Sequence, residues 1–212
     1  MKTVDLDHVA ERIIEQRKRT SRDRGLLVGI SGIDASGKGY ITKQLETRIA
    51  QHTINIANIN VDGWLNLPRK RFSSINAGEH FYNNAIRFDD FFTELLLPLR
   101  DNKSIDVVVY FAEENATEYQ KRNQRFANVS IALVEGIFLF KREYRLLFDL
   151  AIWVDCSFRT ALARAIKRQQ EGLPRAETIR SYETIYFPAQ RLHMDRDQPR
   201  KSVDLIINND QG

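Results

Sequence analysis

A glycine-rich loop between an apolar run and a helical pattern is the feature that most constrains the fold of this chain. Residues 26–31 read Leu-Leu-Val-Gly-Ile-Ser, an apolar run of strand length. The loop follows at once as Gly32-Ile33-Asp34-Ala35-Ser36-Gly37-Lys38, and over residues 37–49 apolar side chains recur one helical turn apart. The order of strand, tight glycine loop and helix predicts a βα unit with the loop at the carboxyl end of the strand.

The loop has the pattern G-x-x-x-x-G-K, which is typical of a phosphate-binding loop. Glycines let consecutive backbone N–H groups turn inward around phosphate oxygens, and the N-terminus of the following helix adds a favourable dipole. Lys38 is placed to reach the β- and γ-phosphates of a nucleotide. We therefore expect a nucleotide to bind Gly32, Ile33, Asp34, Ala35, Ser36, Gly37, Lys38, Gly39 and Tyr40. The alternative is a glycine-rich turn on which Lys38 is only a surface charge.

The residue after Lys38 departs from the motif. The motif has a Ser or Thr there, whose hydroxyl binds Mg²⁺, and this chain has Gly39. Either a water fills the space that Gly39 leaves, since Mg²⁺ commonly keeps several waters, or catalysis is weak or lost. The water is the favoured interpretation, because two further carboxylates stand where a working site needs them.

Those carboxylates each follow a predicted strand. Asp62 closes the run at 54–61, and Glu135 closes the run at 130–134. In a parallel sheet both side chains approach the phosphate loop, because all strands end at the same edge. Phosphoryl transfer needs one carboxylate to take the proton of the acceptor hydroxyl or hold metal, and another to hold metal or its water. Either residue alone is equally well explained as a helix cap or a solvated strand end.

Short apolar runs alternate with helical patterns along the whole chain. Besides the first strand, strands are predicted at 54–61, 130–134, 149–154 and 203–207, and helices at 4–20, 37–49, 81–99, 158–170 and 176–186. Such alternation predicts an α/β fold, with a parallel sheet flanked by helices and ligands beyond the carboxyl ends of the strands. We expect a single domain over residues 1–212, in which residues 1–23 form an N-terminal helix.

One stretch, residues 63–128, is expected to be a small inserted subdomain between core strands. Within it, residues 63–80 look like an irregular loop, and Pro98 is expected to end the helix at 81–99. Residues 105–111 are rich in β-branched side chains and look like one arm of a hairpin.

Composition and charge exclude several classes of protein. The longest apolar run, residues 107–112, is far shorter than the roughly 20 residues that cross a bilayer, and the N-terminal residues lack a secretory signal. A net charge of +4 leaves no strong footprint of nucleic-acid binding, and the single cysteine, Cys156, cannot form an internal disulfide. We therefore expect a cytoplasmic protein whose partner is neither a membrane nor a nucleic acid.

The landmarks of the chain, taken in order, resemble those of the uridine kinase and phosphoribulokinase family of P-loop kinases. They are the phosphate loop, Val61-Asp62-Gly63-Trp64, Val134-Glu135-Gly136-Ile137-Phe138, Val154-Asp155 with Arg164 and Arg168 after it, and Val203-Asp204-Leu205-Ile206-Ile207. The resemblance covers residues 24–208 and implies a P-loop NTPase fold. It also implies ATP-dependent phosphorylation of a hydroxyl on a nucleoside, sugar or similar metabolite, with ATP and Mg²⁺ as cofactors.

The resemblance also assigns roles to single residues. Asp62 matches the catalytic base, beside Lys38 at the phosphates, and Glu135 and Asp62 match the metal site. Arg164 and Arg168 lie four residues apart on one helix face and match arginines that a lid region, residues 158–180 here, carries onto the ATP phosphates. The alternative for both arginines is an exposed basic helix face.

The acceptor pocket departs from the family. Uridine kinases have residues that read a pyrimidine and its ribose, and this chain instead has Tyr110-Phe111-Ala112-Glu113-Glu114-Asn115 and Tyr119-Gln120-Lys121-Arg122. A pocket for another small molecule with a hydroxyl group could be lined by Trp64, Tyr82, Phe111 and Arg122. Aromatic residues in such positions are also common in the core of a subdomain.

Three functions are therefore open. The first is a small-molecule kinase, and the second is a nucleotide-binding regulator or pseudo-kinase with weak or no transfer because of Gly39. The third is an NTPase with water as acceptor. The acceptor and the oligomeric state are left open by the sequence, a homo-oligomer included.

Overall fold

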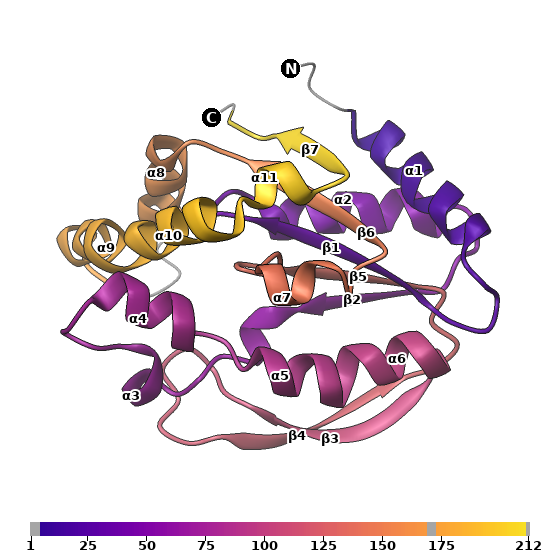
Figure 1. Cartoon of the computed structure of the whole chain (residues 1–212), viewed down its shortest axis with the longest axis horizontal. Helices are drawn as coiled ribbons and strands as arrows, with labels where there is room; N and C mark the ends of the chain where they lie inside the picture. Colours follow the sequence, from indigo (N-terminus) through magenta and orange to yellow (C-terminus); the bar gives the residue numbers. More distant parts are fainter. Residues whose placement is uncertain (1–4, 169–172, 211–212) are drawn as a thin grey trace.

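A computed structural model describes residues 5–168 and 173–210 of the chain. Five parallel strands form the central sheet in the order β2-β5-β1-β6-β7 (Figure 1). Their bounds are β1 Leu26–Gly32, β2 Ile56–Asn60, β5 Ile131–Gly136, β6 Leu150–Asp155 and β7 Leu205–Asn208. The predicted α/β fold is confirmed, and all five carboxyl ends lie at one edge of the sheet.

Helices and one hairpin surround this sheet. The helices are α1 Leu6–Arg19, α2 Lys38–Ala50, α3 Pro68–Arg71, α4 Ala77–Asn84, α5 Phe88–Asp90, α6 Leu97–Asn102, α7 Arg142–Arg145, α8 Phe158–Arg168, α9 Arg175–Ser181, α10 Phe187–Asp197 and α11 Pro199–Ser202. A 3₁₀ turn, η1 Val61–Gly63, follows β2, and two π-helical segments, η2 Phe91–Leu96 and η3 Tyr182–Tyr186, join helices. No helix in the described part of the chain is long and apolar enough to cross a membrane.

Both faces of the sheet are buried, which explains why its strands read as continuous apolar runs. Figure 1 shows α5 and α6 below the strands of the sheet. Ile13 of α1 and Leu45 of α2 share one buried cluster with Leu26 and Ile30 of β1. Leu27, between them in the strand, belongs to the cluster on the other face. Alternate residues of β1 therefore anchor opposite helix layers, and this fixes the position of the loop that follows.

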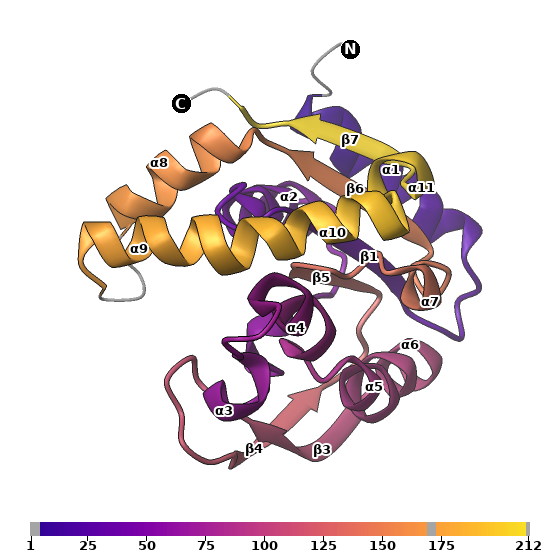
Figure 2. The ribbon, with the colours of Figure 1, turned by 60° about the vertical axis from the view of Figure 1, so that its left-hand side comes forward.

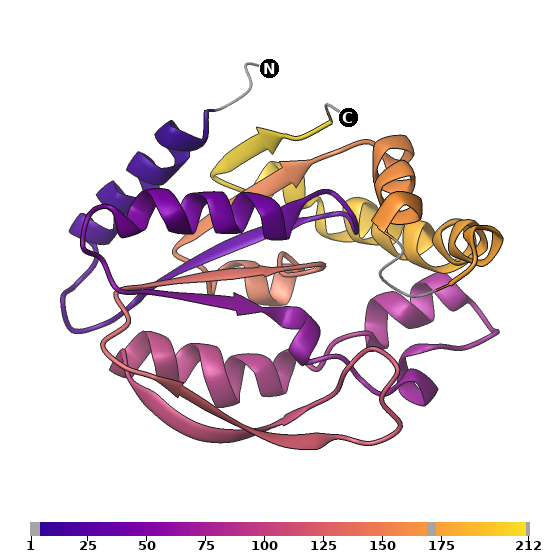
Figure 3. The same cartoon turned by 180° about the vertical axis from the view of Figure 1, so that it is seen from behind.

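The hairpin lies outside the central sheet. β3 (Ile105–Phe111) pairs antiparallel with β4 (Gln120–Phe126), with Val109 opposite Arg122. Figure 3, from behind, shows the two strands curving beneath α5 and α6. The first arm confirms the prediction for residues 105–111. The second arm has the polar sequence Gln-Lys-Arg-Asn-Gln-Arg-Phe, which carries no apolar alternation by which a strand could be predicted.

Two predictions in the inserted stretch are wrong, one of a loop and one of a helix. Residues 63–80, expected to be an irregular loop, contain α3 and the start of α4, and the helix predicted over 81–99 is interrupted at residues 85–87. Pro98 does not end it, because the π-helical turn η2 comes first: the Leu97 N–H bonds to the carbonyl of Phe92, five residues back. Pro98 then stands in the first turn of α6, where a missing N–H costs little.

The helix predicted over 176–186 extends further than expected. Figure 2 shows α9 continuing into α10, and the helix ends at Asp197. Again a π-helical segment precedes a proline, Pro188, in the first turn of the next helix. Charged residues dominate 191–200 and hide the buried face, on which Ala189 and His193 lie. The end predicted for the preceding helix, at residue 170, lies outside the described residues.

A buried polar cluster forms where α10 packs against α4. His193 Nδ1 lies 2.6 Å from Asp197 Oδ2, and the Tyr82 hydroxyl donates to the same oxygen at 2.5 Å. Burial lowers the pKa of His193, although Asp197 opposes this effect. Burial alone would raise the pKa of Asp197, but hydrogen bonds from His193 and Tyr82 outweigh it and lower that pKa. Histidine is therefore neutral here at pH 7 and donates its Nδ1–H to the carboxylate.

We expect this cluster to make the fold sensitive to acid. Because its pKa is lowered in the folded state, His193 binds a proton less readily there than in the unfolded chain. The free energy of unfolding should therefore decrease as pH falls below about 6.5, the ordinary pKa of histidine. Urea unfolding at a series of pH values between neutrality and mild acid measures this slope. His193→Gln should flatten the decline near pH 6, whatever its effect at neutral pH. An unchanged slope in the variant would assign the acid sensitivity to other groups.

Candidate active site

The phosphate loop connects the end of β1 to the start of α2. Ala35 and Gly37 have φ values of 55° and 91°, and a Cβ on Gly37 would lie 2.4 Å from Asn209 Nδ2. Position 37 therefore requires glycine twice over, for its left-handed backbone and for lack of room. The loop ends at the N-terminus of α2, whose first N–H groups have no partners within the helix and suit phosphate oxygens.

Lys38 lies inside this loop. Its side chain is buried, and Nζ donates to the carbonyl oxygen of Ile33 at 3.0 Å. An ammonium group has three donors, so this bond leaves others for phosphate oxygens. The surface charge offered as the alternative for Lys38 is therefore not what the structure shows.

Two further elements reach the loop from the side of β6 and β7. Arg164 of α8 donates to the carbonyl of Ser36 at 3.2 Å, and Asn209, after β7, donates to the same carbonyl at 2.7 Å. Arg168, one turn after Arg164, lies 4.0 Å from the Asp34 carboxylate. Both predicted arginines therefore lie beside the loop. Asn209 was not predicted, because one asparagine in a polar tail carries no signal of its tertiary contact.

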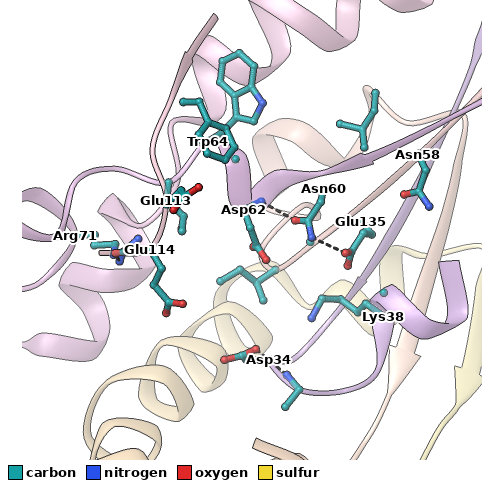
Figure 4. A pocket seen from close by; sticks show the side chains of 18 of the residues that line it. Asp34, Lys38, Asn58, Asn60, Asp62, Trp64, Arg71, Glu113, Glu114 and Glu135 are labelled. Atoms are coloured by element: carbon teal, nitrogen blue, oxygen red, sulfur yellow. Dashed lines mark hydrogen bonds between the residues drawn. The ribbon is translucent and has the colours of Figure 1, made fainter. Parts of the chain in front are cut away.

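An asparagine side chain connects the two predicted acidic residues, Asp62 and Glu135. Asn60 accepts the backbone N–H of Asp62 at 2.7 Å and donates to Glu135 Oε1 at 2.8 Å (Figure 4). The strand β2 ends at Asn60, one residue earlier than predicted, and Asp62 lies in the following turn η1. This turn directs Asp62 toward Lys38, and Figure 4 shows both carboxylates on the side of the lysine. Asn60 was not predicted, since an asparagine in an alternating strand looks like a solvated residue.

Burial shifts both carboxyl groups in the same direction. The Asp62 side chain is open to the cavity but protein surrounds it on most sides, and this desolvation raises its pKa, opposed mainly by Lys38. Desolvation also raises the pKa of the half-buried Glu135, again opposed by Lys38. A positive charge between two carboxylates that resist ionisation is an arrangement common in active sites.

These groups surround one cavity of about 910 Å³. Its end at the phosphate loop is lined by the predicted residues Asp34, Ala35, Gly37, Lys38, Gly39, Tyr40, Arg164 and Arg168, together with Asp62 and Glu135. Gly32, Ile33 and Ser36 of the same loop are buried and do not line the cavity. The arrangement offers cations and N–H donors for phosphates at the point where two carboxylates converge.

The other end of the cavity lies in the inserted stretch. Trp64 is buried there, and the Arg122 guanidinium lies 3.7 Å from the centre of the Phe111 ring. Two carboxylates that were not predicted as site residues, Glu113 and Glu114, also line this end. Burial raises the pKa of Glu114, opposed mainly by a neighbouring arginine. Aromatic surfaces beside polar side chains can orient a small polar molecule here.

Tyr82 does not line this cavity, contrary to the expectation. It is 7% exposed, and its hydroxyl donates to Asp197 in the buried cluster described above. Its ring packs edge-on against Phe138, with ring centres 5.4 Å apart. Tyr82 is therefore a core residue, although these partners lie outside residues 63–128. Another arginine, Arg71, takes part instead: it lines the cavity and donates to the backbone carbonyl of Glu114.

Comparison with known proteins places this site in a family. The family model described as phosphoribulokinase/uridine kinase family matches residues 27–186. Uridine kinase of Limosilactobacillus reuteri (strain DSM 20016) is 24% identical over 204 residues, which cover 92% of this chain and 85% of that protein.

Solved structures support the fold. A possible uridine kinase from Bacillus stearothermophilus superposes with a TM-score of 0.73 at 18% identity, covering 95% of this chain and 96% of that one. D-glycerate 3-kinase from Cryptococcus neoformans var. grubii superposes with a TM-score of 0.67 at 10% identity, covering 98% and 96%. Because the family model spans the phosphate loop, both acidic strand ends and the basic face of α8, this chain belongs to the phosphoribulokinase/uridine kinase family of P-loop kinases.

Proposed function

We propose that this chain transfers the γ-phosphoryl group of ATP to a hydroxyl group of a small metabolite such as a nucleoside or a sugar. One observation carries the proposal: Lys38, Asp62 and Glu135 converge on a single cavity whose far end is formed by the inserted stretch. Residues 63–128 then bind the acceptor. Residues 158–180 act as the lid over the nucleotide, although 169–172 lie outside the described residues.

Asp62 acts as the base in this proposal. It accepts the proton of the acceptor hydroxyl as the hydroxyl oxygen attacks the γ-phosphorus and the bond to the β-phosphate oxygen breaks. A carboxylate with a raised pKa is a better proton acceptor than an ordinary one. Lys38, Arg164 and Arg168 hold phosphate oxygens and stabilise the charge that develops on them.

The residues present suit Mg²⁺. Glu135 and Asp62 supply carboxylate oxygens, which a hard cation prefers, and a Cβ on Gly39 would lie 3.4 Å from Glu135 Oε1. Without that Cβ, a water has room beside the carboxylate where the common motif has a hydroxyl. The described residues contain no group of three or more His, Cys, Asp or Glu that could hold a metal. Phosphate oxygens of the nucleotide and waters would complete the ligand set. When bound, Mg²⁺ neutralises charge on the β- and γ-phosphates.

Replacing Gly39 by serine is expected to reduce the Mg²⁺ concentration needed for nucleotide binding. A serine hydroxyl at this position restores the missing ligand beside Glu135, and we expect the half-saturating Mg²⁺ concentration to fall by about three- to tenfold. Calorimetric titration of an ATP analogue at increasing Mg²⁺ measures it. Gly39→Ala adds the same Cβ without the hydroxyl and is the matched control. Equal shifts in both variants would show that the hydroxyl is not a ligand.

Gly39 also favours the second candidate, a nucleotide-binding regulator or pseudo-kinase with weak or no transfer. That function predicts ATP binding with no turnover that depends on an acceptor. An NTPase, the third candidate, releases phosphate in the absence of any acceptor and leaves the far end of the cavity without a use.

A panel of acceptors tests the kinase directly. Coupled ADP release is followed with Mg²⁺ and ATP against nucleosides, pentoses, ribose-like vitamins and pantothenate, beside the variant Asp62→Ala. Turnover that requires one acceptor and disappears in the variant supports the proposed kinase and names its substrate. ADP release that no acceptor raises above the background of the variant, in a chain that binds ATP, would favour the regulator.

A further inference from the structure

The phosphate loop carries a carboxylate, Asp34, next to the place where nucleotide phosphates bind. Its side chain is 26% exposed and lines the cavity beside Lys38. A negative charge there opposes a polyanion, because like charges in a partly buried site repel each other strongly. The proposed transfer does not use this carboxylate, so its contacts must give the reason for its presence.

One oxygen of Asp34 holds the segment that joins α9 to α10. The Tyr182 hydroxyl donates to Asp34 Oδ2 at 2.8 Å, although the tyrosine is fully buried. The Tyr182 ring packs edge-on against Tyr186 and Phe187, with ring centres 5.2 Å apart in both pairs. Tyr186 lines the cavity. Asp34 is therefore joined through one buried ring to the wall of the cavity and to the long C-terminal helix.

The other oxygen faces α8. Arg168 lies 4.0 Å from Asp34 Oδ1, which also accepts the backbone N–H of Ala35 at 2.7 Å. The Arg168 side chain is 49% exposed, so its guanidinium group can leave a weak ion pair for a stronger partner. A triphosphate is that partner, since it carries more negative charge than one carboxylate and can bind an arginine through two hydrogen bonds.

We propose that Asp34 is a positioning residue: it keeps Arg168 beside the phosphate loop until the phosphates of the nucleotide take that arginine over. The inference rests on the proposed function, because it assumes a nucleotide in this loop. Asp34 lines the same cavity as Asp62 and Glu114, the carboxylates on the side where the proposed transfer occurs. The γ-phosphate is therefore the group that competes most directly with Asp34 for Arg168.

Nucleotide affinities of four proteins test this role without any acceptor. They are the unaltered chain, Asp34→Asn, Arg168→Gln and the double variant, titrated by calorimetry with Mg²⁺ complexes of ADP and of the β,γ-imido analogue of ATP. The amide in Asp34→Asn keeps the size of the carboxylate: its Oδ1 can still accept the Ala35 N–H, and its Nδ2–H can donate to the Tyr182 hydroxyl oxygen, so the fold should tolerate it. Glu183→Gln removes the same charge from an exposed position beside Tyr182 and is the control for net charge.

The expected result is a tighter complex with the ATP analogue, not with ADP. Asp34→Asn should lower the dissociation constant of the analogue by about three- to tenfold, and that of ADP by less than about twofold. When Asp34→Asn is added to Arg168→Gln, the dissociation constant of the analogue should fall by at most about half as much on a logarithmic scale, because no arginine remains to be released. Glu183→Gln should leave both constants unchanged.

If the unaltered chain binds the nucleotides, three outcomes would overturn the inference alone. Equal gains with and without Arg168 would make Asp34 only a repelling charge, and a gain equal for both nucleotides would remove its link to the γ-phosphate. Unchanged or weaker binding of the analogue by Asp34→Asn would mean that the carboxylate does not compete for the arginine. If the unaltered chain binds neither nucleotide, the proposed function fails together with the inference. A failure to phosphorylate any acceptor bears on the proposed function alone, because these titrations contain no acceptor.

Discussion

Asp62→Asn is expected to lower kcat for acceptor phosphorylation by about 1,000-fold, within the range by which general bases accelerate reactions. The amide has the size of the carboxylate but cannot take the proton of the acceptor hydroxyl. ATP affinity measured without Mg²⁺ should be unchanged or higher, because a negative charge leaves the cavity and no metal ligand is lost in that measurement. Steady-state kinetics and calorimetry on the same preparation separate the two effects. A variant that loses nucleotide binding in proportion to turnover would contradict the role of base.

The pH dependence of the same reaction gives a second test of Asp62. The base works only when ionised, so kcat/KM should fall as pH drops through the pKa of Asp62, which burial holds above the ordinary value of about 3.9. This acidic limb should be missing from the residual activity of Asp62→Asn. Glu118→Gln is a suitable control, since it removes a carboxylate from an exposed position in the β3–β4 connection. If the acidic limb is identical in the unaltered chain and in Asp62→Asn, another group is responsible for the titration.

Lys38→Met is expected to lower kcat/KM for ATP by about 100- to 1,000-fold, the usual effect of removing a group that stabilises charge in the transition state. Lys38 is a cation inside the phosphate loop, and methionine keeps the length of the side chain without the charge. The bond to the Ile33 carbonyl is lost as well, so thermal unfolding must confirm that the variant is folded. Kinetics with limiting ATP measure the effect.

The control for this variant lies on the same helix. Lys43→Met removes a charge from an exposed position on α2, where the lysine pairs with Glu46 at 3.1 Å. Its kcat/KM should stay within about twofold of that of the unaltered chain. Similar losses in both variants would mean that the phosphate loop does not bind the nucleotide.

Local sequence patterns predicted the parts of the site that depend on local structure. The strand β1, the glycine loop and α2 follow from an apolar run, the spacing of two glycines and a lysine, and a helical period, all within residues 26–50. The acidic strand ends were predictable for a related reason: parallel strands end at one edge, so Asp62 and Glu135 had to lie near the loop. Only the turn η1, which carries Asp62 beyond the strand, needed the structure.

Residues whose role depends on distant contacts were not predictable. Asn209 and Tyr182 reach the loop from the far end of the sequence, and neither belongs to a pattern of its own. Tyr82 shows the opposite error: an aromatic residue reads the same in sequence whether it lines a pocket or packs in a core. Its partner, Asp197, lies 115 residues away on a helix whose charged residues concealed its buried face. Tertiary packing decided each of these cases.

The destination of the γ-phosphoryl group tests the proposed kinase most directly. The chain is incubated with Mg²⁺ and ATP labelled in the γ-phosphate, with and without the acceptors of the panel, and the labelled products are separated. A kinase of hydroxyl groups places the label in a phosphate ester of one acceptor, and Asp62→Asn slows formation of that product by about 1,000-fold. Label that appears only in inorganic phosphate, at a rate independent of every acceptor, would contradict phosphoryl transfer to a hydroxyl and identify water as the acceptor.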